Sequence, residues 1–200
     1  MSLVRVFIAI EIPAPLQTAI DQQTDSLRNS ADISLVRWVN PYNLHLTLKF
    51  LGDVSSKNIQ FLTQMLTAEA GQYPTFEIQI GKLGSFPTSK RPRVIWIGIQ
   101  APAALEALHH GIDSAATRLG YASEARPFSP HLTIGRVRPH LPATDLQRVQ
   151  RALESHPVGL IGKAPVNAIH LIKSELQPEG SVYTRLFSAP LAVTNPRGDP

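Results

Sequence analysis

The sequence has no cysteine, no run of like charges and no apolar stretch long enough to span a bilayer. Without cysteine the chain forms neither disulfides nor thiolate metal sites, and a reducing cytoplasm is the expected compartment. A membrane-spanning helix needs about 20 consecutive apolar residues, so no membrane association is predicted. The apolar N-terminus is short, is interrupted by Arg5 and is followed by Glu11 and Pro13. It is interpreted as a first strand and not as a signal peptide.

The composition that remains is typical of a globular protein. Hydrophobic residues make up 43% of the chain and charged residues 17%. Two hundred residues are enough for one ordinary domain, or for two small lobes that share a core. The net charge of +4 favours anionic partners such as RNA, although an ordinary basic surface would explain it equally well.

The most informative stretch runs from Asn43 to Phe50. Its apolar residues alternate with polar ones, which predicts a strand with two different faces. One face carries Leu44, Leu46, Leu48 and Phe50, and the other carries His45, Thr47 and Lys49. An imidazole, a hydroxyl and an ammonium side by side are able to bind and act on a phosphate. A single histidine on such a strand is also compatible with a purely structural role.

The same pattern returns at Ser129 to Arg136, where His131-Leu132-Thr133-Ile134 repeats the order His-Leu-Thr-aliphatic. Two matching copies on two predicted strands favour a functional interpretation. Arg136 follows the second copy and is a candidate substrate contact. Strict alternation would turn it toward the core, but Gly135 permits a β-bulge that would redirect it.

Two histidines suit paired acid–base chemistry. The ordinary pKa of histidine is about 6.5, so one ring can accept a proton while the other donates one near neutrality. The hydroxyls of Thr47 and Thr133 are placed to donate hydrogen bonds to phosphate oxygens. Neither motif has a carboxylate or thiolate beside its histidine, so no metal site and no cofactor are predicted. The other histidines are expected outside the site: His109, His110, His140, His156 and His170.

The order of predicted elements suggests a diverged duplication, with halves at about residues 3–83 and 93–188 inside a single bilobal domain at residues 1–190. Each half is predicted as strand, helix, motif strand, helix, strand. Residues 29–40 and the Gly- and Pro-rich segment 81–92 are predicted loops, and residues 191–200 a flexible tail. The predicted strands are 3–10, 43–50, 76–80, 94–99, 129–136, 166–172 and 182–187, and the predicted helices are 13–27, 57–70, 102–119 and 143–154.

On these motifs the sequence resembles the 2H phosphoesterase superfamily, which is named for two His-x-Thr/Ser motifs. It most resembles the branch of RNA 2',3'-cyclic phosphodiesterases, also called the 2'-5' RNA ligase family. The likeness extends from about residue 3 to 188. The flanking stretches that carry it are 5–10, Trp38-Val39, Phe86-Pro87, 91–96, Arg126-Pro127-Phe128, Ser174-Glu175-Leu176 and Tyr183.

The resemblance implies an α+β, bilobal fold, with two pseudo-two-fold-related halves around a central cleft, each with an antiparallel sheet and two helices. It implies an enzyme that hydrolyses RNA 2',3'-cyclic phosphate ends to 2'-phosphomonoesters without metal. We expect the protein to be a monomer. His45 would be the proton donor, His131 the proton acceptor, and Thr47 and Thr133 would hold the phosphate. The reverse reaction would join RNA ends through a 2'-5' linkage.

Several alternatives remain open at this point. Another 2H activity would cleave a 2'-5' linkage or a small cyclic nucleotide phosphate. A non-catalytic RNA-end binder would keep the pocket without turnover, although both intact His-x-Thr motifs argue against it. Tyr42 and Phe128 flank the motifs, where either ring would stack a base or pack against the core. Lys49 is expected to share the face of His45 and to add positive charge.

Overall fold

A computed structural model describes residues 2–30, 34–178 and 180–193. These residues form an α+β structure with two antiparallel sheets, which confirms the predicted fold class. The four-stranded sheet has the order β3-β1-β8-β9, and the five-stranded sheet has the order β2-β6-β5-β4-β7. The strands are β1 (Leu3–Glu11), β2 (Val36–Trp38), β3 (His45–Ser55), β4 (Phe76–Thr88), β5 (Arg91–Gln100), β6 (His131–Val137), β7 (Leu160–Val166), β8 (Ala168–Gln177) and β9 (Gly180–Pro190).

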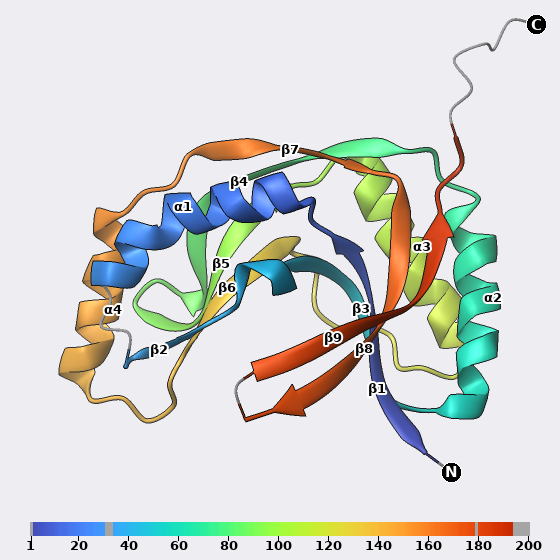
Figure 1. Cartoon of the computed structure of the whole chain (residues 1–200), viewed down its shortest axis with the longest axis horizontal. Coiled ribbons are helices and arrows are strands. Elements are labelled where there is room, and N and C mark those ends of the chain that lie inside the picture. The colour runs from blue at the N-terminus through green and yellow to red at the C-terminus, as the bar shows by residue number, and fades with distance from the viewer. Residues whose placement is uncertain (1, 31–33, 179, 194–200) are drawn as a thin grey trace, which may run out of the picture.

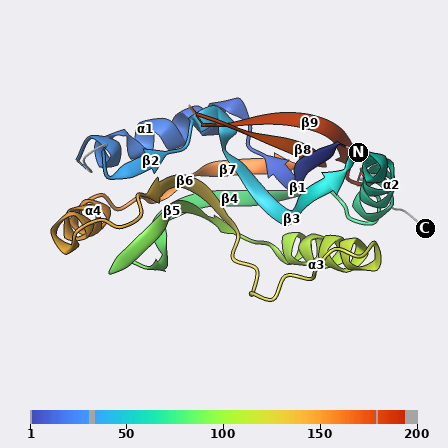
Figure 2. The same ribbon diagram turned by 90° about the horizontal axis from the view of Figure 1, so that it is seen from below.

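Two α-helices pack on each sheet (Figures 1 and 2). Helices α2 (Ile59–Ala70) and α3 (Ala103–Arg118) lie side by side against the four-stranded sheet, through β3, β8 and β9. Helices α1 (Ala14–Ser30) and α4 (Ala143–Ser155) lie together at the other end and contact β7 and β5. We call these units the four-stranded lobe and the five-stranded lobe.

The lobes do not coincide with the two sequence halves. Strands β1 and β3 come from the first half and share a sheet with β8 and β9 from the second, where β1 pairs with β8. Helix α1 follows β1 in the sequence, yet it packs on β7 in the other lobe. Helix α3 follows β5 and packs on β3. The chain therefore crosses between lobes, because each of these two helices covers a sheet to which the strand before it does not belong.

One continuous hydrophobic core runs through both lobes. Along β1 the side chains of Val6, Ile8 and Ile10 are buried in this core, as the alternation of apolar residues predicts. The core also includes side chains of β5, β6 and β8 and of all four helices in the described part of the chain. A shared core ties the lobes into a single unit and fixes the strands that carry the two His-x-Thr motifs.

The predicted loop at 81–92 is wrong, because these residues continue β4 and begin β5 in a paired hairpin. The glycine at position 84 does not turn the chain but leaves space for a neighbouring side chain. A Cβ atom on Gly84 would lie 2.2 Å from a ring carbon of Trp96, so the indole occupies the space that a side chain would need. The predicted loop at 29–40 is partly wrong, because it contains β2. Strand β7 was not predicted.

The start of the predicted tail belongs to the folded part. Leu191 is buried in the core, and its N–H donates to the Asn167 carbonyl. Ala192 exchanges backbone hydrogen bonds with Tyr73 and Thr75. The remainder of the predicted tail, residues 194–200, lies outside the described residues. Among the described helices, none combines the length and the apolar character needed to cross a bilayer.

Candidate active site

The first motif lies on β3, whose pairing with β1 decides which way each side chain points. Cross-strand partners in an antiparallel sheet share a face. His45 pairs with Glu11 and Thr47 with Ala9, but the register then shifts at Leu48, so Phe50 pairs with Phe7. The shift places Phe50 on the face of His45 and Thr47. The prediction is therefore wrong for Phe50, which was assigned to the core and is 63% exposed.

Lys49 turns the other way for the same reason. It pairs with Ile8, which is fully buried in the core, and Lys49 itself is only 5% exposed. The expectation that Lys49 shares the face of His45 is wrong. The register shift adds one residue to β3 and thereby reverses the alternation beyond Leu48.

The second motif repeats this geometry on β6. His131 pairs with Gly98, Thr133 with Trp96 and Arg136 with Val94, with a register shift at Ile134. Since Gly98, Trp96 and Val94 alternate along β5, their partners all lie on one face. The bulge predicted near Gly135 is thus present, and it turns Arg136 away from the core to the face of His131. Thr133 is half-buried and Arg136 is exposed.

Both histidines are held by a backbone carbonyl two residues earlier. In the first motif, Asn40 accepts a hydrogen bond from the Tyr42 N–H and Pro41 begins a short 3-10 turn (Pro41–Asn43), which presents the Asn43 carbonyl to His45. The Nδ1 atom of His45 lies 2.8 Å from the Asn43 oxygen, and Nδ1 of His131 lies 2.6 Å from the Ser129 oxygen. A carbonyl oxygen only accepts, so each Nδ1 carries a proton. Each Nε2 is left to exchange a proton with a ligand.

Each imidazole also rests against two aromatic rings. The ring centroids of Phe7 and Tyr183 lie 4.7 and 5.1 Å from that of His45. Around His131 the rings of Phe86 and Trp96 lie at 5.0 and 6.4 Å. None of these four ring contacts with a histidine was predicted. The period-two pattern of β1 contains a signal for Phe7, which is the bulky residue on the face opposite Val6 and Ile8.

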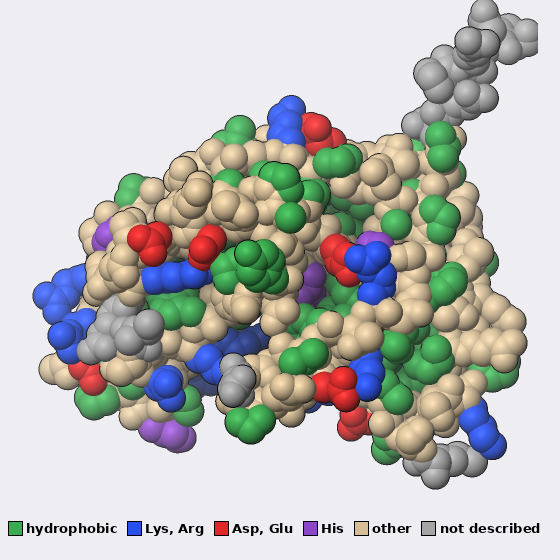
Figure 3. Space-filling model, viewed as in Figure 1, with side chains coloured by type: hydrophobic (Ala, Val, Ile, Leu, Met, Phe, Trp, Pro, Cys, Tyr) green, Lys and Arg blue, Asp and Glu red, His purple; other side chains and the backbone are tan. Residues whose placement is uncertain are grey.

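The two motif strands lie next to each other, one from each lobe. Arg136 on β6 is close enough to lower the pKa of His45 on β3. Figure 3 shows a hollow near the centre of one face of the molecule, with histidine (purple) and basic side chains (blue) at it. Two imidazoles whose Nδ1 atoms are bound to carbonyls, two hydroxyls and a guanidinium are a suitable set for moving protons around a bound anion.

Burial and charged neighbours together set the pKa of His45. Burial lowers its pKa most, the Asn43 carbonyl and the Glu11 carboxylate oppose this, and Arg136 adds to the lowering, so the pKa stays below its ordinary value. Glu11 is itself engaged by Arg185, whose Nε and Nη2 donate to its two oxygens at 3.0 and 2.5 Å. The pair fixes the carboxylate beside His45, and sequence pattern gives no sign of Arg185, which is 174 residues away.

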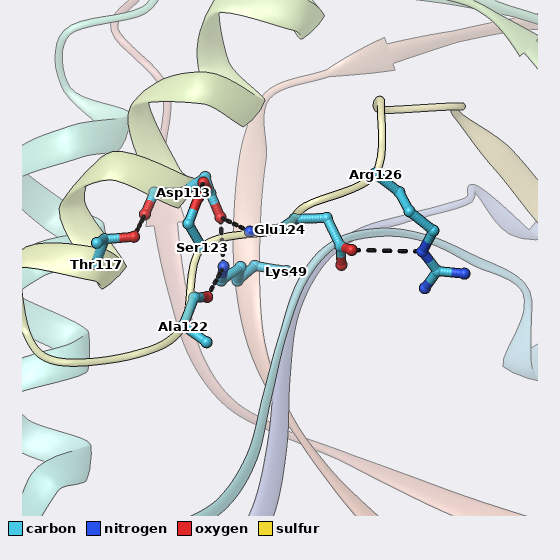
Figure 4. A network of polar contacts seen from close by, with 7 residues as sticks. All are labelled: Lys49, Asp113, Thr117, Ala122, Ser123, Glu124 and Arg126. Carbon is cyan, nitrogen blue, oxygen red and sulfur yellow. Dashed lines mark hydrogen bonds and ion pairs between the residues drawn. The ribbon is translucent and has the colours of Figure 1, made fainter.

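Lys49 forms part of a polar network that joins β3, α3 and the loop between α3 and β6 (Figure 4). Its ammonium pairs with Asp113 on α3 and donates to the Ala122 carbonyl at 2.5 Å. Asp113 also accepts from the Ser123 hydroxyl at 2.7 Å and from the Glu124 N–H at 3.2 Å. Burial alone would raise the pKa of Asp113, but these hydrogen bonds lower it to about 2. Lys49 therefore anchors the loop that leads to His131.

The two predicted stacking residues have different surroundings. Tyr42 lies in the 3-10 turn before His45, and its side chain is 78% exposed. The Phe128 ring stacks on His109 of α3, with centroids 3.8 Å apart and an angle of 13° between the planes. It also packs against the core. One face of the Phe128 ring is therefore already covered by protein, whereas Tyr42 remains open to solvent.

His170 was predicted to lie outside the site, but β8 brings it to the same sheet face as Thr47. Both residues pair with Ala9, one on each side of β1. The Nδ1 atom of His170 lies 2.7 Å from the Ser188 hydroxyl. Burial lowers the pKa of His170, Glu11 raises it and Arg185 lowers it. Among the described residues, no group of three His, Asp or Glu side chains is placed to hold a metal ion.

Comparison with known proteins identifies close relatives. A sequence profile of the 2'-5' RNA ligase superfamily matches residues 15–178. The RNA 2',3'-cyclic phosphodiesterase of Methanothermobacter thermautotrophicus is 34% identical over 181 residues, which cover 90% of this chain and 95% of that protein. The protein of the same name from Aquifex aeolicus is 29% identical and covers 92% and 95% of the two chains.

Solved structures give the same picture. The crystal structure of the Thermus thermophilus protein TT0787 matches with a TM-score of 0.76 and 26% identity, over 95% of this chain and 99% of that one. The crystal structure of E. coli LigT complexed with 3'-AMP matches with a TM-score of 0.73 and 29% identity, over 95% and 99%. The likeness therefore includes both lobes and both motif strands.

Proposed function

The chain belongs to the 2'-5' RNA ligase superfamily, and from this premise we propose that it hydrolyses RNA 2',3'-cyclic phosphate ends to 2'-phosphomonoesters. The observation that carries the proposal is the duplicated site on β3 and β6. Each strand presents a histidine with its Nδ1 bound to a carbonyl and a threonine two residues on. Relatives named RNA 2',3'-cyclic phosphodiesterase support the same substrate.

The reaction must move two protons, and the resemblance to the 2H phosphoesterases assigns one to each histidine. His131 Nε2 takes a proton from water, whose oxygen attacks the cyclic phosphorus. His45 gives its Nε2 proton to the 3'-oxygen as the P–O3' bond breaks, which leaves a 2'-phosphomonoester. Solvent then restores the proton of His45 and removes that of His131. Each transfer contributes roughly 10²–10⁴ in rate.

The threonines and Arg136 act on the charge of the phosphate. Thr47 and Thr133 share a face with the histidines and donate to the non-bridging oxygens as negative charge develops. A hydrogen bond to a charged group is worth roughly 1.5–3 kcal/mol. The guanidinium of Arg136 lies further along the same face and adds a fixed positive charge beside this phosphate.

The test is turnover of an oligonucleotide that ends in a 2',3'-cyclic phosphate, with EDTA present throughout. We expect full activity with the chelator and a 2'-phosphomonoester as the only product by phosphorus NMR. Loss of turnover with EDTA would refute the metal-independent mechanism. Release of a 3'-phosphomonoester would reverse the bond assigned to cleavage, and exclusive cleavage of internal 2'-5' linkages would indicate the alternative 2H activity.

Both motifs come from one chain, so a single copy contains every residue assigned to the reaction. This supports a monomeric enzyme, which light scattering during gel filtration would test. The absence of cysteine suits the reducing cytoplasm as its location. Cell fractionation with an antibody against the chain would test that location.

A further inference from the structure

Two arginines stand directly opposite each other beside the candidate active site. Arg37 on β2 pairs with Arg136 on β6, and both side chains are exposed. Within the described residues, neither guanidinium has an ion pair or a hydrogen-bond partner. Like charges directly opposite in a sheet are destabilising. The arrangement is therefore unfavourable for the protein by itself and becomes favourable when an anion lies between the two side chains.

Pairing on the two strands settles the direction of Arg37. Trp38, the next residue, pairs with Gly135 on the core side, where its ring fills the space that a Cβ on Gly135 would occupy. Arg37 therefore faces the same side as Arg136. That side is the one occupied by His131 and Thr133, because β5 pairs with all three residues of β6 on a single face.

The distance from the reacting phosphate fits a neighbouring phosphate group. Thr133 and Arg136 pair with Trp96 and Val94, which are two residues apart on β5, so they lie about 7 Å apart along the sheet. Arg136 is near enough to His45 to lower the pKa of that residue. Arg37 lies one strand spacing further, about 4.8 Å across the sheet. The two guanidinium groups therefore extend the positive charge of the site away from the histidines.

The four-stranded lobe has no counterpart to this pair among the described residues. The residue of β3 that corresponds to Arg136 is Phe50, which also follows the register shift. Strand β3 is the edge of its sheet, so no described strand occupies the position that β2 takes beside β6. Among the described residues, the opposed arginine pair thus lies on one side of the site, which gives a bound strand a direction.

We propose that Arg37, together with Arg136, binds the phosphodiester on the 5' side of the terminal nucleotide of an RNA strand. The inference rests on the proposed function and specifies its substrate: an RNA of two or more nucleotides ending in a 2',3'-cyclic phosphate. A mononucleoside 2',3'-cyclic phosphate has no such phosphodiester and gains nothing from Arg37. Arginine suits this role because its planar fork matches phosphate oxygens.

The experiment compares two substrates with the same terminal nucleoside: a mononucleoside 2',3'-cyclic phosphate and a tetranucleotide ending in that cyclic phosphate. For Arg37→Gln we expect the ratio of kcat/KM, tetranucleotide over mononucleotide, to fall about tenfold, as for loss of one hydrogen bond to a charged group. Arg37→Lys keeps the charge, so this ratio should fall less for that variant. The matched control is Arg118→Gln on α3, whose side chain is 70% exposed and pairs only weakly with Glu69.

Salt dependence provides a second readout. One contact to a single-stranded phosphate contributes about −0.7 to the slope of log affinity against log salt. We expect Arg37→Gln to remove about that amount from the slope for the tetranucleotide, and Arg37→Lys to retain it. We also expect Arg37→Gln to unfold at higher urea concentration, because it relieves the repulsion of Arg136. Weaker substrate binding together with higher stability is the combination expected when a functional residue destabilises the fold.

An unchanged substrate ratio with Arg37→Gln, or an equal loss for both substrates, would overturn the inference. Failure of the unaltered protein to turn over either substrate would instead refute the proposed function. In that case, fluorescence anisotropy tests the Arg37 site by measuring how tightly each variant binds a tetranucleotide that ends in a 2'-phosphate. Weaker binding by Arg37→Gln than by Arg118→Gln would retain the site, and equal binding would reject it.

Discussion

The two motif strands differ in ways that their shared pattern conceals. Both β3 and β6 carry His-x-Thr, a register shift after the threonine and a histidine locked by a carbonyl. Beyond the shift, β3 places Lys49 in a buried ion pair and Phe50 on the open face. At the same positions β6 has Gly135 against Trp38 and an exposed Arg136.

The difference suggests a division of work between the lobes. The four-stranded lobe surrounds His45 with Phe7, Tyr183 and the Glu11–Arg185 pair, which tune and orient one imidazole. The five-stranded lobe supplies positive charge through Arg136 and Arg37. The two lobes thus place two similar His-x-Thr motifs in two different electrostatic settings, which the proposed acid–base catalysis requires.

The strongest test of this asymmetry removes each histidine. His45→Ala and His131→Ala should each lower kcat on a cyclic-ended RNA by roughly 10²–10⁴. The two should differ on an aryl phosphodiester that releases p-nitrophenolate, a leaving group that needs no proton. There His45→Ala should keep most of its activity and His131→Ala should not. Stopped-flow absorbance measures both, and equal losses on the aryl ester would contradict the assigned roles.

Next in size is the buried ion pair that β3 possesses and β6 lacks. Lys49→Met leaves Asp113 without its ammonium partner and should cost roughly 3–5 kcal/mol of unfolding free energy in urea. Asp113→Asn is the matched change from the other side of the pair. If both variants lose less than about 1 kcal/mol, the network does not anchor the loop before His131.

The same pair predicts a pH dependence. Asp113 has its pKa lowered to about 2 in the folded protein, from an ordinary value of 3.8. Its contribution to stability is therefore complete above about pH 4 and is lost as the pH falls toward 2. In Lys49→Met this acid-dependent part of the unfolding free energy should be smaller. Urea midpoints measured across this acid range would show it.

The corresponding position in β6 predicts a smaller effect. A Cβ on Gly135 would lie 2.9 Å from atoms of Trp38 and Val36, so Gly135→Ala forces these side chains to move. Overpacking of this kind typically costs about 1–3 kcal/mol. Gly159→Ala is a suitable control, because a Cβ on Gly159 would have no neighbour within 4 Å. Gly120→Ala is not suitable, because the φ of Gly120 is +91°. Equal unfolding free energies for Gly135→Ala and Gly159→Ala would contradict the close packing at Gly135.

The smallest predicted effects concern the titration of His45. Arg136 lowers its pKa and Glu11 raises it, so Arg136→Gln should raise the pKa and Glu11→Gln should lower it further. As a proton donor His45 must be protonated, so the alkaline limb of the pH profile should move up in the first variant and down in the second. NMR titration of the ring proton measures the pKa directly. A shift of the same sign in both variants would contradict the electrostatic coupling.

Sequence reasoning was most successful where a local pattern had a single physical reading. The alternation in each motif predicted a strand with its histidine and threonine on one face, and the structure confirms this for both copies. It was less successful where glycine and proline were taken as signs of a loop. At Gly84 the glycine exists to accommodate the ring of Trp96, a contact that the sequence does not reveal. The duplication itself stays a prediction.

By itself, the sequence determined the two motif strands and the shared face of the histidine and threonine on each, since these depend only on alternation over a few residues. Only the tertiary structure decided that Lys49 is buried while Phe50 and Arg136 lie on the open face. A register shift is a property of two paired strands and cannot be read from one. For the same reason the neighbours of the site, Arg185 and Arg37, became visible only when the sheets were assembled.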